Sequence, residues 1–178
     1  MKKVITALLL VLSVSAFGQS ETIEEYHDKY EPDQSFYFYK STLRMFARLS
    51  KQWAERDGAE IPDLSELIDG IEKAKYFSYR ASSDDKATFK KLRTDVLAEG
   101  YNEEASFSDR GSNTKVSILV KYSSSNSDQP VGYALLGLSE DNLMMLDVEG
   151  SPSLESMGQF ATYMFASGND FSWLGSLR

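Results

Sequence analysis

Hydrophobic positions recur along the chain with two different periods, and the change of period marks the expected elements. Within residues 42–56, apolar residues from Leu43 to Ala54 recur at i, i+3, i+4 and i+7 spacing, which predicts a helix with one apolar face. In the segment "TKVSILVKY", by contrast, alternate residues from Val116 to Tyr122 are apolar. That two-residue period predicts a half-buried strand.

Three further helices are expected before the chain turns to strands. Residues 22–30 are polar and helical in character, and residues 64–68 form a short helix. Ser82 begins the next helix, because Asp85 stands three residues later at the spacing of a capping box. Gly100 suits the left-handed position that closes this helix. The inner face of the helix is formed by Phe89, Leu92 and Val96.

Five further segments are predicted to be strands. Three of them are "SFYFYKS", "KAKYFSYR" and "YNEEASFSD". Residues 131–138 and 143–148 form two more, and they should pair antiparallel because a four-residue connection cannot make a parallel crossover. Both of these strands are apolar on both faces, which is typical of central strands.

The hairpin is followed by signals for a last helix. Gly150 ends the strand, Ser151 is the expected N-cap, and Pro152 occupies the first helical position, where its missing N–H is harmless. Leu154 and Met157 begin the expected inner face of this helix.

Helices cluster early in the chain and strands late. This order predicts an α+β fold in which helices pack on one face of a largely antiparallel sheet. No Pro- or Gly-rich linker divides the sequence, so residues 19–178 are expected to form a single domain.

The first eighteen residues have the layout of an export signal. Two lysines precede an apolar run over residues 4–14, and Ala16 and Gly18 stand at the small-residue positions of a cleavage site. Residues 1–18 are therefore predicted to be a signal peptide, removed before Gln19. A periplasmic or secreted location follows from this prediction, without a membrane anchor.

Charge and cysteine content narrow the classes of partner. The chain has 19 basic and 27 acidic residues, and loss of Lys2 and Lys3 leaves 17 against 27, a formal net charge of −10. Such a charge repels nucleic-acid phosphates and anionic lipid surfaces, so no nucleic-acid partner is expected. The chain has no cysteine, so it holds no disulfide and its stability must come from its core.

Three segments resemble a family of small exported bacterial proteins, domain-of-unknown-function family 4252. They are "LSELIDGIEKAKYFSYR", "FKKLRTDVLAEGYNEEASFSD" and "LLGLSEDNLMMLDVEGSPSL". The resemblance covers about residues 35–165 and carries no catalytic signature. It implies no established activity, and it implies an envelope-stress context because some members are encoded beside extracytoplasmic sigma-factor systems.

The chain departs from the pattern of this family in two places. Members tend to finish the last hairpin with Gly-Asn-Ile-Asp-Leu, where this chain has residues 150–154, "GSPSL". Loss of the acidic residue argues against a shared essential carboxylate there. Many members also resemble lipoproteins, whereas Gln19 stands where a lipid-bearing Cys would be needed.

Catalytic and metal-binding chemistry has few candidates. His27 could act as a general base or metal ligand with Glu24 or Asp28, or it could be a surface residue of a polar helix. Zinc sites use several Cys or His residues, which are absent here. The segments "SSSNSDQ" and "SEDN" lack the spacing of a calcium loop. We therefore expect neither a metal nor another cofactor.

Adjacent carboxylates are a second catalytic possibility. The pairs are Asp84-Asp85, Glu103-Glu104 and Glu140-Asp141. Adjacent residues of a strand point to opposite faces, so Glu103 and Glu104 should not act together. The other two pairs stand at a helix start and a turn, where acids are structurally favoured.

Aromatic residues are the candidates for partner binding. Tyr37 and Tyr39 lie in one aromatic run, and Tyr76 and Tyr79 in a second. Where such residues face solvent they form an amphipathic patch suited to a protein or glycan. The favoured alternative is that helices cover both runs and leave only the hydroxyls at the rim. Phe171 and Trp173 in the tail either fold back on the core, which is the favoured arrangement, or form an apolar tag.

These observations favour a non-enzymatic module that binds a protein or another envelope component. Two alternatives stay open: a hydrolase that uses carboxylates in a cleft, and a carrier of a small apolar ligand. A hydrolase needs convergent acids with displaced pKa values, whereas a carrier needs an apolar cavity of about 300 Å³ or more.

Overall fold

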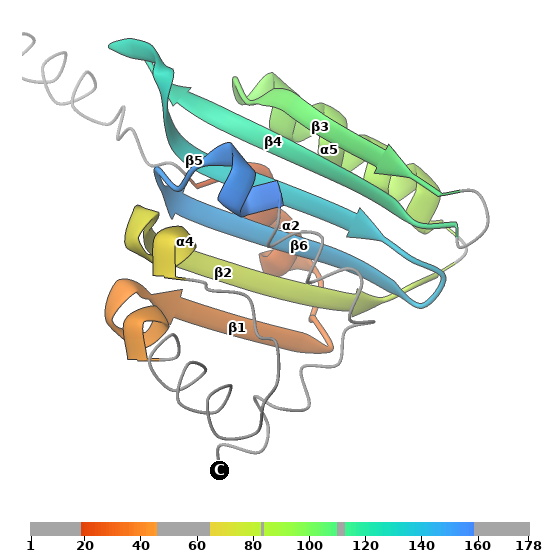
Figure 1. Cartoon of the computed structure of the whole chain (residues 1–178). Coiled ribbons are helices and arrows are strands. Elements are labelled where there is room, and N and C mark those ends of the chain that lie inside the picture. Colours follow the sequence, from red (N-terminus) through yellow and green to blue (C-terminus); the bar gives the residue numbers. More distant parts are fainter. Residues whose placement is uncertain (1–18, 46–64, 83, 110–112, 159–178) are drawn as a thin grey trace, which may run out of the picture.

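The computed structural model describes residues 19–45, 65–82, 84–109 and 113–158 (Figure 1). The predicted leader, most of the predicted helix 42–56, and the tail with Phe171 and Trp173 lie outside these residues.

A six-stranded sheet organises the described part of the chain. Its strands are β1 (Gln34–Tyr39), β2 (Ile71–Arg80), β3 (Asn102–Ser108), β4 (Lys115–Ser123), β5 (Asn126–Leu138) and β6 (Asn142–Gly150). The order is β1-β2-β6-β5-β4-β3, and every neighbouring pair is antiparallel. The predicted hairpin of residues 131–138 and 143–148 is confirmed as β5 and β6, which occupy the centre of the sheet.

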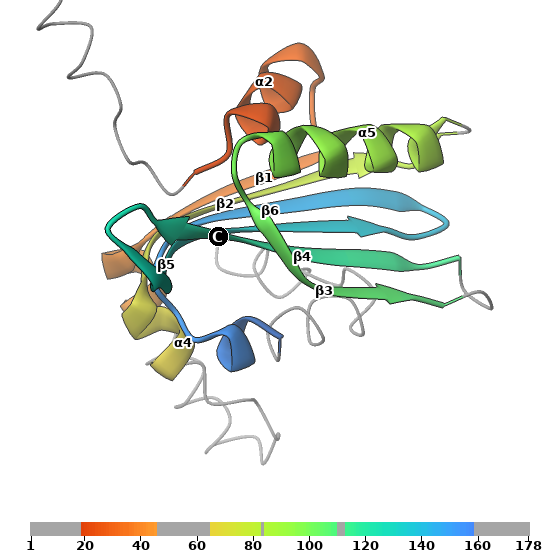
Figure 2. The same ribbon diagram turned by 90° about the horizontal axis from the view of Figure 1, so that it is seen from above.

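Helices lie on both faces of this open sheet. They are α2 (Glu21–Lys29), α4 (Ser65–Gly70) and α5 (Asp85–Ala98), and residues 40–45 and 154–158 are also helical. Figure 2 shows α2 and α5 on one side of the sheet, with α4 and helix 154–158 on the other. The α+β class is confirmed, but the expected placement of helices on one face is not. The physical reason is that the central strands are apolar on both faces, so both faces need cover.

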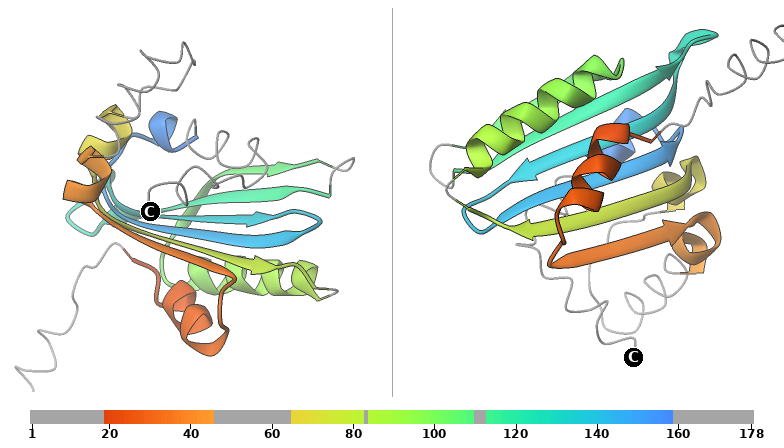
Figure 3. Two further views of the ribbon diagram at one scale, coloured as in Figure 1. Left: turned by 90° about the horizontal axis from the view of Figure 1, so that it is seen from below. Right: turned by 180° about the vertical axis from the view of Figure 1, so that it is seen from behind.

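Strand alternation divides the buried residues into two clusters. Val116, Ile118 and Val120 of β4 belong to the cluster that also contains Met157, whereas Leu119 joins the cluster beneath α2 and α5. Figure 3 shows this second face, with α5 along β4 and β5 and α2 beside it over the middle of the sheet. Phe89, Leu92 and Val96 are buried there, as the helical pattern predicts.

The start and end of α5 follow their sequence signals with one change. The Asp85 carboxylate accepts a hydrogen bond from the Ser82 N–H, as capping-box spacing predicts,. The N-cap position itself, however, is taken by Asp84. Gly100 has φ of +89°, which confirms the left-handed residue expected at the end of the helix,.

The last helix begins later than its sequence signals predict. Its N-cap is Ser153, whose Oγ accepts the Ser156 N–H at 3.0 Å, so the expected cap at Ser151 is wrong. Ser151 instead donates its N–H to the Gly70 carbonyl at 2.8 Å, which holds it at the end of β6. Consequently Leu154 is 42% exposed rather than internal, while Met157 is buried as expected.

Candidate functional site

The edge strand β1 presents tyrosines on the face that carries α2. Phe36 and Phe38 pack against the cluster on the other face, so alternation turns Tyr37 and Tyr39 toward the α2 side,. Tyr37 is 44% exposed and Tyr39 is 57% exposed. These two residues, which we call the tyrosine edge, are therefore accessible to a partner.

His27 of α2 holds one member of the tyrosine edge. Its Nε2 is 3.2 Å from the Tyr37 hydroxyl, and its ring packs on Phe77 with centroids 4.3 Å apart. Its Nδ1 lies 3.4 Å from a carboxylate oxygen of Asp28. No serine in the described ranges hydrogen-bonds to this ring, so the observed role of His27 is to orient the Tyr37 phenol and tie α2 to β1.

Two of the four strand tyrosines predicted for partner binding are buried. Tyr76 is 3% exposed and stacks on Phe36, whereas Tyr79 is 7% exposed and meets the edge of the Tyr26 ring at 5.1 Å. Burial raises the pKa of both phenols. These two side chains therefore form no exposed patch, because β2 lies between two strands and is covered on both faces.

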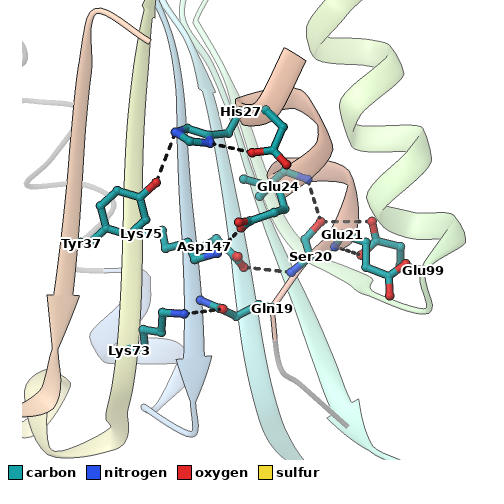
Figure 4. Close-up of polar contacts among 12 residues, drawn as sticks. Gln19, Ser20, Glu21, Glu24, His27, Tyr37, Lys73, Lys75, Glu99 and Asp147 are labelled. Atoms are coloured by element: carbon teal, nitrogen blue, oxygen red, sulfur yellow. Dashed lines mark hydrogen bonds and ion pairs between the residues drawn. The ribbon is translucent and has the colours of Figure 1, made fainter. Parts of the chain in front are cut away.

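A buried polar group lies beneath α2, next to the tyrosine edge (Figure 4). Lys75 of β2 and Asp147 of β6 are paired in register, and both are buried. The Lys75 ammonium forms an ion pair with the Glu24 carboxylate. The Ser20 N–H donates to Asp147 Oδ1 at 3.1 Å. We call these four residues, together with Glu99, the Asp147 cluster.

Glu99 caps the first turn of α2 from the end of α5. Its carboxylate accepts from the Ser20 hydroxyl at 3.2 Å, from the Glu21 N–H at 3.1 Å and from the Thr22 N–H at 2.6 Å. Free N–H groups and the helix dipole make a helix N-terminus favourable for a carboxylate. The contact fixes the start of α2 against α5, although the two segments are far apart in sequence.

Asp147 has the most displaced carboxyl pKa in the described part of the chain. Burial raises its pKa from 3.8 to about 7. The Ser20 N–H and Lys75 act in the opposite direction, whereas Glu24 and Glu99 raise the pKa further. Asp147 is 0% exposed, so a group that could exchange a proton near neutral pH is sealed from any substrate in this conformation.

Two residues of this cluster could have been identified from the sequence, because each is a single charged residue within an apolar strand segment. Asp147 is the single charged residue in the apolar run "LMMLDV", and Lys75 interrupts "AKYF" in the same way. A lone charge in a strand that is apolar on both faces has no solvated side to occupy, so it predicts a buried polar contact. Glu99 gave no comparable signal.

The adjacent carboxylates are engaged separately, as strand alternation predicts. Glu103 binds Arg93 of α5 through two hydrogen bonds, and its pKa is lowered chiefly by that contact. Glu104 accepts instead from the Tyr122 hydroxyl at 3.0 Å. In the described ranges no group of three or more His, Asp or Glu side chains is arranged to hold a metal ion.

Comparison with known proteins identifies the family. The model of the family described as "Domain of unknown function (DUF4252)" matches residues 28–160. The chain belongs to the DUF4252 family. The match covers all six described strands, together with the tyrosine edge and Asp147, whereas Ser20, Glu24 and His27 precede it. Neither the curated proteins nor the solved structures compared with this DUF4252 chain give a match.

Among the helices described for this DUF4252 chain, none is both long enough and apolar enough to cross a membrane.

Proposed function

We propose that this DUF4252 protein is a non-enzymatic module of the bacterial envelope that binds a protein partner through the tyrosine edge. The observation that carries the proposal is the exposure of Tyr37 and Tyr39, at 44% and 57%, on the edge strand of a sheet whose central strands are covered on both faces. The export signal predicted in residues 1–18 supports the envelope location, and the sigma-factor context of the family supports a role in stress response.

Tyrosine suits this role because of its shape and its polar end. Each ring offers a large rigid apolar surface at a low cost in side-chain entropy, and the hydroxyl remains able to hydrogen-bond. The hydrogen bond between Tyr37 and His27 already fixes one of the two rings. Binding therefore orders less of the surface than it would for two free side chains.

A carboxylate hydrolase is less well supported. Its best acid is Asp147, whose raised pKa suits a general acid near neutral pH,. A catalytic acid must come within hydrogen-bond reach of its substrate. Asp147 is fully buried beneath α2, so the hydrolase would require α2 to leave the sheet in each catalytic cycle.

Site-specific photocrosslinking tests the binding proposal. A photoreactive phenylalanine analogue is placed at position 37, 39 or 107 and irradiated in cells of the producing organism. Phe107 is a matched control, because it is an aromatic residue of the opposite edge strand β3 and is 61% exposed. We expect one and the same protein to be crosslinked at positions 37 and 39, without a crosslink at 107.

The affinity of the purified partner completes the test. We expect Tyr39→Ser to weaken binding at least tenfold, since truncation of an aromatic anchor costs about 2 kcal/mol or more, while Phe107→Ser leaves the affinity unchanged. Equal crosslinking at all three positions, or equal affinity of the two variants, would refute a specific role for the tyrosine edge.

A further inference from the structure

The carboxylate of Asp147 has one oxygen that lacks a hydrogen-bond donor. Oδ1 accepts the Ser20 N–H, but Oδ2 is buried and no described residue donates to it. Burial of a carboxylate is costly unless its oxygens are hydrogen-bonded or its charge is paired. The site is therefore suited to one more cationic donor.

The start of the mature chain lies next to this oxygen. Ser20 is already bonded to Asp147, and covalent geometry keeps the Gln19 backbone nitrogen within about 3.6 Å of the Ser20 nitrogen. The sequence predicts cleavage between Gly18 and Gln19. Hydrolysis of that bond adds one water, releases Gly18 as a carboxylate and converts the Gln19 amide nitrogen into an α-ammonium group.

We propose that removal of the leader creates an α-ammonium group at Gln19 that binds Asp147 Oδ2 and fastens the mature N-terminus to β6. The proposal rests on the export predicted under the proposed function, but it does not depend on the tyrosine edge or on a partner. In the uncleaved chain the same nitrogen is a neutral amide and carries no charge to offer.

The charges around Asp147 favour this arrangement. Lys75 of β2 favours the ionised form of Asp147, whereas Glu24 of α2 and Glu99 after α5 oppose it. The Tyr101 phenol also interacts with Asp147. Lys73 bonds to the Gln19 side chain and lies opposite Glu149 of β6 in the register. Among the charged groups that act on Asp147, one lysine therefore faces two glutamates, before the charge of an ionised Asp147 itself is counted. An α-ammonium group reduces this excess of negative charge.

The Gln19 side chain is held in a way that keeps the amine available. Its Oε1 accepts from Lys73 Nζ at 3.2 Å. An N-terminal glutamine can cyclise when its amine attacks its own Cδ, which forms a lactam, releases ammonia from Nε2 and removes the positive charge. An α-ammonium group that is bound to Asp147 has no lone pair for that attack, so we expect an open N-terminus in the mature protein.

Two purified chains that differ at one end test the ion pair. One begins at Gln19 and the other carries Gly-Ser before Gln19, and both retain the Gln19 side chain, whose Nε2 is a competing neutral donor. The Asp147 carboxyl is titrated in each by ¹³C NMR. We expect its acid dissociation constant to be at least tenfold larger in the chain that begins at Gln19, since an ammonium partner lowers a carboxyl pKa by about one unit or more.

Stability provides a second readout. At pH 7 we expect the chain that begins at Gln19 to melt at a higher temperature than the extended chain, and this difference to disappear when both carry Asp147→Asn. Equal dissociation constants in the two wild-type chains would overturn the proposal, even if the Asn variants fail to fold.

The N-terminal sequence of the exported protein is then determined, and its mass is measured by mass spectrometry. A first residue of open Gln19 supports the proposal. A retained leader, a different first residue or a cyclised Gln19 overturns it. None of these measurements involves a partner, so failure here is distinguishable from failure of the crosslinking experiment.

Discussion

At the scale of single residues, two positions have properties that are unusual for their environment: a glycine with a positive φ and a fully buried carboxylate. Gly150 has φ of +135°, and a Cβ there would lie 2.2 Å from the Gly70 carbonyl oxygen. Asp147 is a carboxylate with no solvent around it. Position 150 therefore tolerates no Cβ, and position 147 carries a charge that is costly to bury. One substitution at each position tests its effect on stability.

Gly150→Ala should destabilise the protein more than Gly100→Ala. Both glycines have positive φ, but a Cβ at position 100 meets nothing within 4 Å, whereas at position 150 it collides with backbone atoms. We expect Gly100→Ala to lower the free energy of unfolding by about 1 kcal/mol and Gly150→Ala by at least about 2 kcal/mol. Urea denaturation measures both, and equal losses would show that the close approach at Gly150 relaxes freely.

Asp147 should make stability depend on pH. Its pKa is about 7 in the folded protein against 3.8 in its ordinary state, so between these values the folded chain retains a proton that the unfolded chain has released. Stability therefore falls as pH rises from about 4 to 7, by up to about 4 kcal/mol. This applies to a chain extended beyond Gln19, in which the α-ammonium group is absent.

The variant Asp147→Asn should lose this pH dependence. Its free energy of unfolding, measured by urea denaturation between pH 4 and 7, should rise relative to that of the wild-type chain as the pH increases. Glu103, whose pKa is lowered in the folded protein, contributes with the opposite sign, but it is present in both chains and cancels. If the free energies of unfolding of the two chains changed with pH in parallel, Asp147 would not be the source of the pH dependence.

At the scale of elements, polar contacts between distant segments fix the helices to the sheet. Glu99 joins the end of α5 to the start of α2, and Arg93 joins α5 to β3 through Glu103. The Ser117 hydroxyl of β4 donates to the same Glu103 carboxylate. These contacts lie where strand β3 has an irregular register, between Glu103 and Ala105, so they hold a strand whose pairing is interrupted.

A double-mutant cycle measures the bond between α5 and β3. We expect Arg93→Met and Glu103→Gln each to lower the free energy of unfolding, with a coupling of about 1 kcal/mol, because the contact is bidentate but Arg93 remains partly exposed. Lys91→Met is the control, since the Lys91–Asp95 pair lies on the exposed side of the same helix. A coupling of zero, or an equal loss for the control, would assign the pair no structural role.

At the scale of the whole molecule, one sheet separates two apolar clusters. Leu135 belongs to one cluster and Met145 to the other, and the strands that carry them are adjacent. Because every central strand contributes to both clusters, neither cluster can be lost while the other remains intact. The described residues should therefore unfold as a single unit.

Truncations on the two faces test this cooperativity. We expect Leu135→Ala and Met145→Ala each to cost about 2–5 kcal/mol, and each variant to unfold in one transition that is the same by tyrosine fluorescence and far-ultraviolet circular dichroism. Leu154→Ala, at a half-exposed position, should change stability by about 0.5 kcal/mol or less. Two separate transitions would mean that the clusters fold independently.

The sequence predicted features that depend on neighbouring residues, but it did not predict features that depend on contacts between residues distant in sequence. The alternation of Val116, Ile118 and Val120 and the left-handed Gly100 are local, and both predictions were correct. The cap at Ser151 was wrong because a contact with Gly70, distant in sequence, holds that residue at the strand end. Strand order could not be predicted, since the partners of a strand are chosen by the whole fold.

In the candidate site, too, local features were predicted and features that depend on distant contacts were not. Alternation along β1 predicted that its aromatic residues divide between the two faces, and on one of these faces Tyr37 and Tyr39 are exposed. The burial of Tyr76 and Tyr79 depends on the strands beside β2 and the layers over it, which no local pattern reveals. The same is true of Glu99, whose partner is the start of another helix.

The strand order also bears on when the sheet can form during synthesis. Strands β3, β4 and β5 each pair with the next strand along the chain, but β2 pairs with β6, the last of the six to be synthesised. Ile71 meets Gly150 across that pair, so the ribosome must add about eighty residues before β2 finds its second neighbour, and pairings of long sequence separation form slowly. The pairing of β2 with β6 therefore forms only after the last of the six strands has been synthesised.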